Sequence, residues 1–397
     1  MYKVLTLNQI SARGLDKFSD RLYQVGSELE NPDAILVRSF KLSEDDVTPS
    51  LRAVGRAGAG VNNIPVPACT DQGVVVFNTP GANANAVKEL VLLAMLLSSR
   101  GIIDGIDYVK GLAHVTDHDE LSKLVEGSKK NYKGNEIAAK TLGVIGLGAI
   151  GSLVADMGVR LGMEVVGYDP GLSVDAAWLL SSSIQKMENI PALLSRADMV
   201  SLHVPVLDST RELINAETLS QCKEGAVLLN FARAELVNSE HLLQAMETGR
   251  ISQYISDFPT PSLLGKKGVT AIPHLGASTA EAEDNCAMMV ADQVMDFLEN
   301  GNIRNSVNFP SLNLDRSGAF RIALANRNVP RILSNVLSIL AQRNINVIDM
   351  SNRSRDDVAY NLIDIETAPD QELVDEIQSI DGVINVRTFD EPADGSR

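Results

Sequence analysis

The chain has 397 residues, of which 45% are hydrophobic and 22% charged, a composition typical of globular proteins and long enough for two or three domains. Its net charge of −16 argues against nonspecific nucleic-acid binding, so an anionic substrate would have to meet locally placed arginines and lysines. The three cysteines, Cys69, Cys222 and Cys286, are widely spaced, which favours buried, reduced thiols. The sequence begins with a strand-like run that lacks the shape of a signal peptide, so a cytoplasmic location is expected.

Short apolar runs alternate with more polar segments over the first 90 residues, which indicates α/β organisation around a parallel sheet. The strand-like runs are 4–7, 34–37, 54–55 and 74–77. A long helix is predicted over 83–99, ending at Gly101, and its apolar run 90–97 is too short to cross a bilayer. Residues 105–136 are polar and of mixed charge, without a strong period.

The segment 141–169 combines a strand-like run, a glycine turn, a helix, a second strand-like run and an acidic residue. Gly146, Gly148 and Gly151 have the G-x-G-x-x-G spacing, which permits a tight turn, a close approach to a pyrophosphate and close packing of helix on strand. Asp169 would accept hydrogen bonds from a ribose hydroxyl and repel a 2′-phosphate. The segment therefore predicts a dinucleotide site that prefers NAD to NADP. The alternative is a glycine-rich turn in another α/β domain.

The second half of the chain continues this alternation and then changes rhythm. Strand-like runs recur at 199–202, 226–230, 254–256 and 269–271, a capping box at 278–281 opens a helix to about residue 300, and 302–317 resembles a linker. The last 80 residues follow a β-α-β-β-α-β order, typical of a ferredoxin-like unit. The predicted fold class is α/β, with two doubly wound parallel-sheet (Rossmann-like) domains and a C-terminal ferredoxin-like domain. The predicted boundaries are 1–98 with 279–310, then 99–278, then 318–397.

Three stretches carry candidate chemistry at strand ends. They are 230–235 (NFARAE), 273–278 (PHLGAS), and 56–63 (RAGAGVNN) together with 78–81 (NTPG). The guanidinium of Arg233 can form a bidentate pair with a carboxylate, and His274 can exchange a proton near neutral pH. Together with a nicotinamide, the two predict a site for oxidation of a hydroxy acid.

At this point the sequence resembles the D-isomer-specific 2-hydroxyacid dehydrogenases over nearly its whole length. The matching motifs are VRS at 37–39, GRAGAGVNNI at 55–64, NTPG at 78–81, AKTLG at 139–143, GLGAIG at 146–151, GYDP at 167–170, HVP at 203–205, NFARA at 230–234 and PHLGAS at 273–278. The C-terminal unit is similar to an ACT domain, a small regulatory module of many of these enzymes. The resemblance implies NAD as cofactor and a homodimer or homotetramer. It also implies a cleft between the first two domains that closes on a substrate.

The resemblance also implies roles for individual residues. Arg233 matches the arginine that binds the substrate carboxylate and His274 the catalytic acid/base; the alternatives are a structural ion pair and a core histidine. The cofactor set is Gly146, Gly148, Ala149, Ile150, Gly151, Asp169, His203, Val204, Pro205, Phe231, Ala232, Arg233, Asp257, His274 and Gly276. The substrate set is Arg38, Ser39, Ala59, Gly60, Asn83, Arg233 and His274. For His203, a structural role is an equal alternative to a cofactor contact. For Arg38 and Ser39, a solvated loop is an equal alternative to substrate binding.

One departure from the family concerns the segment 256–261, which reads SDFPTP. The family pattern is Asp-Val-Phe-x-x-Glu-Pro, whose glutamate orients the catalytic histidine, and here that glutamate is missing. Asp257 is either the nicotinamide-side aspartate displaced by one residue or a support for His274. The sequence leaves both possibilities open.

Two further regions carry weaker signals. In the ACT-like unit, Asn328 and Asn346 match effector-binding positions, whereas Asn326 and Arg331 replace a histidine and a glycine of serine-responsive relatives. An effector site and a role in subunit pairing alone are equally favoured. Lys129 and Lys130 lie in a stretch that in related dimers can reach toward the neighbour's active site, but a solvated surface is favoured. His114 and His118 have an i, i+4 spacing that could suit a metal, but no third ligand is evident and a solvated segment is favoured.

The favoured function is NAD-dependent oxidation of 3-phospho-D-glycerate to 3-phosphohydroxypyruvate, the first step of L-serine biosynthesis. No nucleic-acid or membrane partner is expected. One alternative is another D-2-hydroxyacid dehydrogenase, or a hydroxypyruvate or glyoxylate reductase. The other is a non-catalytic NAD-sensing regulator on the same fold.

Overall fold

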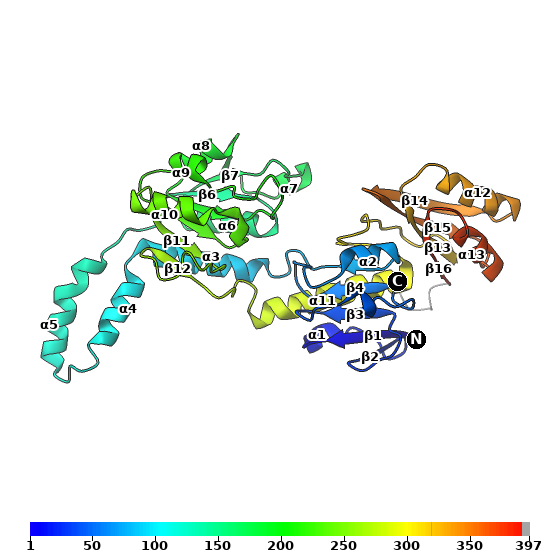
Figure 1. Ribbon diagram of the computed structural model, residues 1–397, viewed down its shortest axis with the longest axis horizontal. Helices are drawn as coiled ribbons and strands as arrows, with labels where there is room; N and C mark the ends of the chain where they lie inside the picture. Colours follow the sequence, from blue (N-terminus) through cyan, green and yellow to red (C-terminus); the bar gives the residue numbers. More distant parts are fainter. Residues whose placement is uncertain (319, 391–397) are drawn as a thin grey trace. The chain divides into compact units, whose positions relative to one another are not determined.

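The computed structural model describes residues 1–318 and 320–390, which divide into two compact units (Figure 1). Unit 1 contains residues 1–82 and the described residues from 280 onward, and unit 2 contains residues 83–279. The predicted domain 318–397 includes residue 319 and residues 391–397, which lie outside the described residues. The division into three domains stays a prediction.

Unit 1 contains a five-stranded parallel sheet with the order β2-β1-β3-β4-β5. The strands are β1 (Tyr2–Leu7), β2 (Tyr23–Gly26), β3 (Ala34–Val37), β4 (Ala53–Arg56) and β5 (Val75–Phe77). Short helices lie between them at α1 (Ala12–Leu15), η1 (Glu44–Asp46) and α2 (Val66–Asp71). The four predicted runs are all strands, and β2 is an additional edge strand whose mixed residues carry no alternating pattern.

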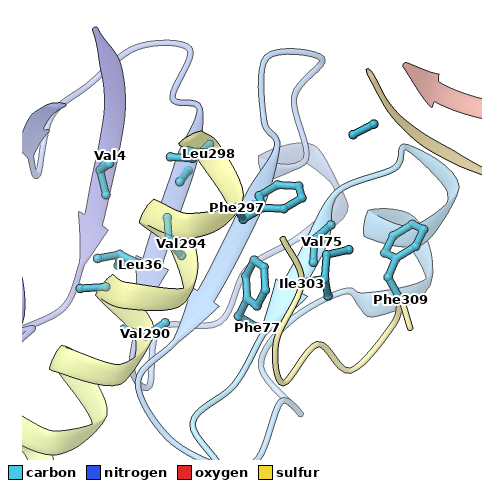
Figure 2. Close-up of a cluster of buried hydrophobic side chains, with 14 of the residues drawn as sticks. Val4, Leu36, Val75, Phe77, Val290, Val294, Phe297, Leu298, Ile303 and Phe309 are labelled. Carbon is cyan, nitrogen blue, oxygen red and sulfur yellow. The ribbon is translucent and has the colours of Figure 1, made fainter. Parts of the chain in front are cut away.

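Helix α11 (Ala280–Asn300) covers this sheet with its apolar side (Figure 2). Val290 and Val294 lie near Gly55 of β4, where an added Cβ would come within 2.5 Å of Val290 Cγ2. The glycine therefore permits the close approach of helix and strand. The segment predicted as a linker is instead packed: Ile303 and Phe309 are fully buried in the same core.

The C-terminal part of unit 1 is a four-stranded antiparallel sheet with two helices, as the β-α-β-β-α-β order predicted. Its elements are β13 (Phe320–Arg327), α12 (Ile332–Gln342), β14 (Val347–Arg355), β15 (Val358–Ile365), α13 (Gln371–Gln378) and β16 (Val383–Phe389), with the sheet order β14-β15-β13-β16. One face packs on α12 and α13, and the other joins the core of α11. Tyr360 on that second face donates from its hydroxyl to the carbonyl of Gly301 at 2.9 Å.

A fully buried ion pair joins this sheet to the segment before it. Arg321 of β13 lies opposite Asp364 of β15, with Nε–Oδ1 and Nη2–Oδ2 distances of 2.5 and 2.9 Å. The remaining guanidinium N–H groups donate to the carbonyls of Asn300, Leu314 and Asp315. All five guanidinium N–H groups therefore have acceptors.

Unit 2 contains a seven-stranded parallel sheet with the order β12-β11-β10-β9-β6-β7-β8. The strands are β6 (Thr141–Ile145), β7 (Glu164–Tyr168), β8 (Ile184–Lys186), β9 (Met199–Leu202), β10 (Ala226–Asn230), β11 (Ile251–Ser256) and β12 (Val269–Ala271). The helices are α3 (Ala84–Ser99), α6 (Ala149–Arg160), α7 (Val174–Trp178), α8 (Ile190–Leu194), α9 (Ala216–Ser220) and α10 (Ser239–Glu247), with η3 (Ala234–Leu236). The direction of winding reverses between β6 and β9, where doubly wound sheets bind ligands at the carboxyl ends of their strands.

Residues 102–132, most of which belong to the stretch 105–136 without a strong sequence period, form an arm of two helices that extends from unit 2 (Figure 1). The arm comprises α4 (Ile102–Gly111), α5 (His118–Ser128) and η2 (Lys129–Tyr132). Tyr108 joins its parts, because its hydroxyl donates to the carbonyl of Leu124 and its ring packs 5.8 Å from that of Tyr132. Neither α4 nor α5 contains a buried residue.

Two further expectations can be compared with the structure. All three cysteines are free thiols in buried positions, as predicted from their spacing. Within residues 1–318 and 320–390, no helix combines the length and apolar character needed to cross a membrane.

Candidate active site

Of the three glycines in the turn after β6, two have no room for a side chain and one faces open space. A Cβ on Gly151 would lie 1.8 Å from the carbonyl oxygen of Gly146, and a Cβ on Gly146 would lie 2.5 Å from that of His203. At Gly148, by contrast, an added Cβ would meet no atom within 4 Å. Gly148 immediately precedes α6, whose first N–H groups face the open side of the turn. This cradle fits a dinucleotide pyrophosphate, with Ala149 and Ile150 beside it.

Asp169 lies one residue beyond β7, beside the glycine turn. Its Oδ2 accepts from the backbone N–H of Leu147 at 2.8 Å, and its Oδ1 accepts from Gly171 at 2.9 Å. These two bonds hold the carboxylate at the carboxyl edge of the sheet. Each oxygen retains a lone pair that can accept from a ribose hydroxyl.

His203 follows β9 and packs behind the turn. Burial lowers the pKa of its imidazole to about 3, so the ring is neutral at pH 7. Its Nε2 lies 2.8 Å from Ser201 Oγ, and its buried Nδ1 has no partner in the described residues. This placement favours the structural alternative for His203, with Val204 and Pro205 continuing the loop toward solvent.

Arg233 is placed by the turn that follows β10. Asn230, the last residue of β10, is fully buried, and its amide donates to the Arg233 carbonyl at 2.8 Å and accepts from Ala232 N–H at 3.2 Å. Phe231 is also buried, so only its backbone borders the site. The guanidinium of Arg233 donates from Nη1 to the Ala232 carbonyl at 2.7 Å, and its Cζ lies 5.6 Å from the centroid of the Phe258 ring. Its other N–H groups have no protein acceptor among the described residues.

His274 lies after β12 in a left-handed backbone conformation, with a φ of 54°. Asp257 holds this conformation: its carbonyl accepts from His274 N–H, and its carboxylate accepts from Leu275 and Gly276 N–H at 2.6 and 2.7 Å. Burial raises the pKa of the Asp257 carboxyl, although the two N–H bonds act in the opposite direction. We infer that Asp257 supports His274 through the backbone, which is the second of the two alternatives open in the sequence.

The three strands β10, β11 and β12 are neighbours in the sheet, with Asn230 beside Ser256 and Ser256 beside Ala271. Arg233, Phe258 and His274 therefore follow the same edge. The rings of His274 and Phe258 lie 4.7 Å apart, at an interplanar angle of 50°. Sequence reasoning missed Phe258, because an aromatic residue before a proline carries no signal of contact with two distant loops.

Four of the predicted substrate residues, Arg38, Ser39, Ala59 and Gly60, lie in unit 1 after β3 and β4. The guanidinium of Arg38 pairs with Glu283 at 2.7 Å, and its carbonyl accepts from Arg56 Nε at 3.1 Å. Arg56 belongs to the motif at 55–64 but was not assigned to the site from the sequence. It is the last residue of β4, opposite Val37, and its place in the motif was the signal that could have identified it.

Asn83 lies in unit 2 at the start of α3, with its Oδ1 buried and without a partner in the described residues. The grouping of the unit 1 residues with Arg233 and His274 stays a prediction, as does the role of Asn83.

The effector positions also stay predictions. Asn328 Nδ2 donates to the carbonyl of Asp356 at 3.1 Å, and Asn346 Nδ2 donates to Glu366 Oε1 at 2.8 Å. Arg331 adopts a φ of 77°, a conformation that glycine reaches without strain, at the position where serine-responsive relatives have glycine. In the part of the chain that the structure describes, no three His, Cys, Asp or Glu side chains are grouped to hold a metal ion.

Comparisons with known proteins agree with this geometry. Residues 102–276 match the family described as D-isomer specific 2-hydroxyacid dehydrogenase, NAD binding domain. The chain is 37% identical over 292 residues to D-3-phosphoglycerate dehydrogenase of Synechocystis sp., covering 71% of this chain and 50% of that protein. It is 32% identical over 357 residues to D-3-phosphoglycerate dehydrogenase of Haemophilus influenzae, covering 87% of this chain and 82% of that protein. The chain thus spans about half the length of the Synechocystis relative.

Among solved structures, the NAD+-bound 3-phosphoglycerate dehydrogenase of Entamoeba histolytica is similar, with a TM-score of 0.60 and 25% identity. The match covers 78% of this chain and 99% of that one. A D-lactate dehydrogenase of Treponema pallidum shares the fold, with a TM-score of 0.65 at 21% identity.

Proposed function

Because the chain belongs to the D-isomer-specific 2-hydroxyacid dehydrogenase family, we propose that it oxidises 3-phospho-D-glycerate to 3-phosphohydroxypyruvate with NAD, the first step of L-serine biosynthesis. One observation carries the proposal. Arg233 follows β10 and His274 follows β12, the two strands on either side of β11, in a sheet whose glycine turn is open for a pyrophosphate. The similarity to two D-3-phosphoglycerate dehydrogenases supports the choice of substrate.

Each residue has a defined part in the proposed reaction. The unpaired N–H groups of Arg233 bind the substrate carboxylate and place the hydroxyl-bearing carbon beside the imidazole. His274 accepts the proton of that hydroxyl as the C–O bond becomes a carbonyl. When bound, NAD supplies the acceptor for the hydride that leaves the same carbon. Asp257 keeps the imidazole in position through the backbone of its loop.

The substrate phosphate is assigned to the arginine group of unit 1. Arg38 follows β3 and Arg56 ends β4, and guanidinium groups can neutralise a phosphate in an otherwise acidic protein. A phosphate there would compete with Glu283 for the guanidinium of Arg38. Ser39, Ala59 and Gly60 would supply hydroxyl and backbone donors beside them.

The experiment that tests the function measures NADH formation with NAD and 3-phospho-D-glycerate, and compares it with D-glycerate and D-lactate. Reduction of hydroxypyruvate and glyoxylate is measured with NADH. Arg38→Ala is expected to raise KM for 3-phospho-D-glycerate only. Equal turnover of the unphosphorylated acids would instead favour a general hydroxyacid dehydrogenase or reductase. Binding of NAD without turnover of any acid would favour the NAD-sensing regulator.

Asp169→Ala is expected to raise KM for NAD by about tenfold and to reduce the preference for NAD over NADP. A hydrogen bond to a charged acceptor contributes about 1.5–3 kcal/mol, and the carboxylate repels a 2′-phosphate only while it is present. Steady-state kinetics with both cofactors measures this change. The matched control is Asp175→Ala on the nearby α7. An unchanged ratio of kcat/KM for the two cofactors would show that Asp169 does not bind the ribose.

We propose that the arm of α4 and α5 pairs with a second copy of the chain. Ile106 and Val109 of α4 are 49% and 53% exposed, and neither arm helix buries a residue within its own chain. Ile106→Glu combined with Val109→Glu is expected to convert the oligomer to monomer, measured by light scattering after size exclusion. Val174→Glu, at an apolar residue of α7 that is 73% exposed, is the control. A wild-type monomer, or an oligomer that the double variant leaves intact, would exclude this interface.

The C-terminal unit is proposed as an ACT-like module. The β13–β16 sheet with two helices on one face supports it. Measuring the rate of NADH formation while L-serine is added separates the two roles considered for this module. Inhibition that Asn346→Ala abolishes would indicate an effector site. An unchanged rate would indicate subunit pairing alone.

A further inference from the structure

The ring of Phe258 contacts both of the side chains to which the reaction is assigned. Its centroid is 4.7 Å from the centroid of the His274 imidazole and 5.6 Å from Cζ of Arg233. Three separate loops, after β10, β11 and β12, thus meet at one aromatic ring. No other aromatic ring contacts either side chain in the described residues.

The backbone of Phe258 is fixed on both sides. Its N–H donates to Ser256 Oγ at 3.0 Å, and that hydroxyl is 3.4 Å from the Phe258 carbonyl. Ser256 and Asp257 are 1% and 2% exposed, so the ring projects from a buried anchor, and Pro259 restricts the residue that precedes it. The backbone position from which the ring projects is therefore set by the end of β11.

Asp257 acts on His274 through the backbone of its loop and through its charge, but no hydrogen bond within the described residues orients the imidazole itself. The imidazole of His274 is exposed and has no hydrogen bond or ion pair with any described residue, and the Asp257 carboxylate is directed to backbone N–H groups. The Arg233 guanidinium has a single bond, to the adjacent carbonyl. The face of an aromatic ring carries negative charge density and attracts a nearby cation. Phe258 can therefore orient both groups and stabilise the imidazolium that forms when His274 accepts a proton.

We propose that Phe258 is a positioning residue, which performs through its ring the orienting role that a carboxylate beside the histidine would otherwise have. The proposal rests on the proposed function, because it assigns the charge that Phe258 stabilises to the proton taken by His274. It predicts that an aromatic ring is required at this position, whereas an aliphatic side chain of similar size is not sufficient.

The test compares Phe258→Leu with Phe258→Tyr in the full chain. For Phe258→Leu we expect kcat/KM with 3-phospho-D-glycerate to fall about tenfold, the change that corresponds to a barrier higher by about 1.4 kcal/mol. The acid limb of its pH–rate profile is expected to shift to lower pH, because the imidazolium has lost the ring, and KM is expected to rise as Arg233 loses its orientation. Phe258→Tyr keeps an aromatic ring and is expected to retain the wild-type kcat/KM, acid limb and KM. Phe40→Leu, at an exposed phenylalanine, is the control.

A second measurement does not require turnover. Isotope-labelled histidine reports each of the five imidazoles by NMR, and His274→Asn assigns the resonance of His274. The ring current of Phe258 is expected to shift the His274 resonance, and Phe258→Leu is expected to remove that shift. A shifted resonance in a protein without dehydrogenase activity refutes the proposed function but keeps the contact. An active protein in which Phe258→Leu leaves the acid limb and the His274 resonance unchanged overturns the proposal.

Discussion

Replacing His274 by asparagine is expected to lower kcat for oxidation of 3-phospho-D-glycerate by about 10²- to 10⁴-fold, the range for loss of a general base. Asparagine also tolerates the left-handed backbone that His274 adopts, so the loop held by Asp257 is retained. The affinity for NADH, measured by fluorescence titration, is expected to change little. The loss would then lie in the chemical step and not in the assembly of the site.

His118→Asn is the matched control for this variant, because His118 is the first residue of α5, in the exposed arm. It is expected to leave kcat unchanged. If His274→Asn retained more than a tenth of the wild-type kcat, the proton would have another acceptor. The assignment of His274 as the base would then be wrong.

Replacing Arg321 by methionine is expected to destabilise unit 1 by about 3–5 kcal/mol, because the buried carboxylate of Asp364 loses its opposite charge and keeps only its hydrogen bonds from Ser317. Three backbone carbonyls, those of Asn300, Leu314 and Asp315, would lose their donor in the same step. Denaturant unfolding monitored at equilibrium measures the change. Arg160→Met, which removes an exposed pair with Asp156, is the control and is expected to have no measurable effect.

The double variant Arg321→Met with Asp364→Leu is expected to recover part of this loss, since no unpaired charge then remains. Burial acts to raise the pKa of Asp364, but the hydrogen bonds from Arg321 and Ser317 and the charge of Arg321 outweigh it, so the pKa is lowered. Its contribution to stability is therefore present above the ordinary carboxyl pKa and is lost as the pH falls through the lowered value. The acid-induced loss of stability is expected to be smaller in the double variant. A single variant as stable as the wild type would show that the pair does not hold this sheet.

Local sequence patterns were sufficient for the fold class and for most elements. The glycine spacing at 146–151 is a backbone requirement, and a Cβ at Gly151 would indeed collide with the Gly146 carbonyl. The runs 226–230 and 269–271 are strands with the predicted bounds. The first is buried throughout and nearly continuously apolar, as expected for a central strand of a parallel sheet, whereas the second is a partly exposed edge strand. The β-α-β-β-α-β order of the last 80 residues was likewise visible from periodicity alone.

The arm and the supposed linker were not predicted, because their structure depends on contacts outside the segment. Helix α4 has exposed apolar residues and no buried residue, so packing within its own chain does not account for its apolar positions. Residues 302–317 contain Asn, Ser and Pro like a linker, yet Ile303 and Phe309 are buried in a core that includes the five-stranded sheet far back in the sequence.

The sequence by itself determined that the chain binds a dinucleotide on a doubly wound sheet and that Arg233 and His274 are its candidate catalytic residues. Only the tertiary structure decided what surrounds them. It directs the carboxylate of Asp257 to the backbone of the His274 loop, and it brings the ring of Phe258 into contact with both His274 and Arg233. The physical reason is that β10, β11 and β12 lie side by side in the sheet. Residues far apart along the chain then meet at one edge, and no local pattern records such a meeting.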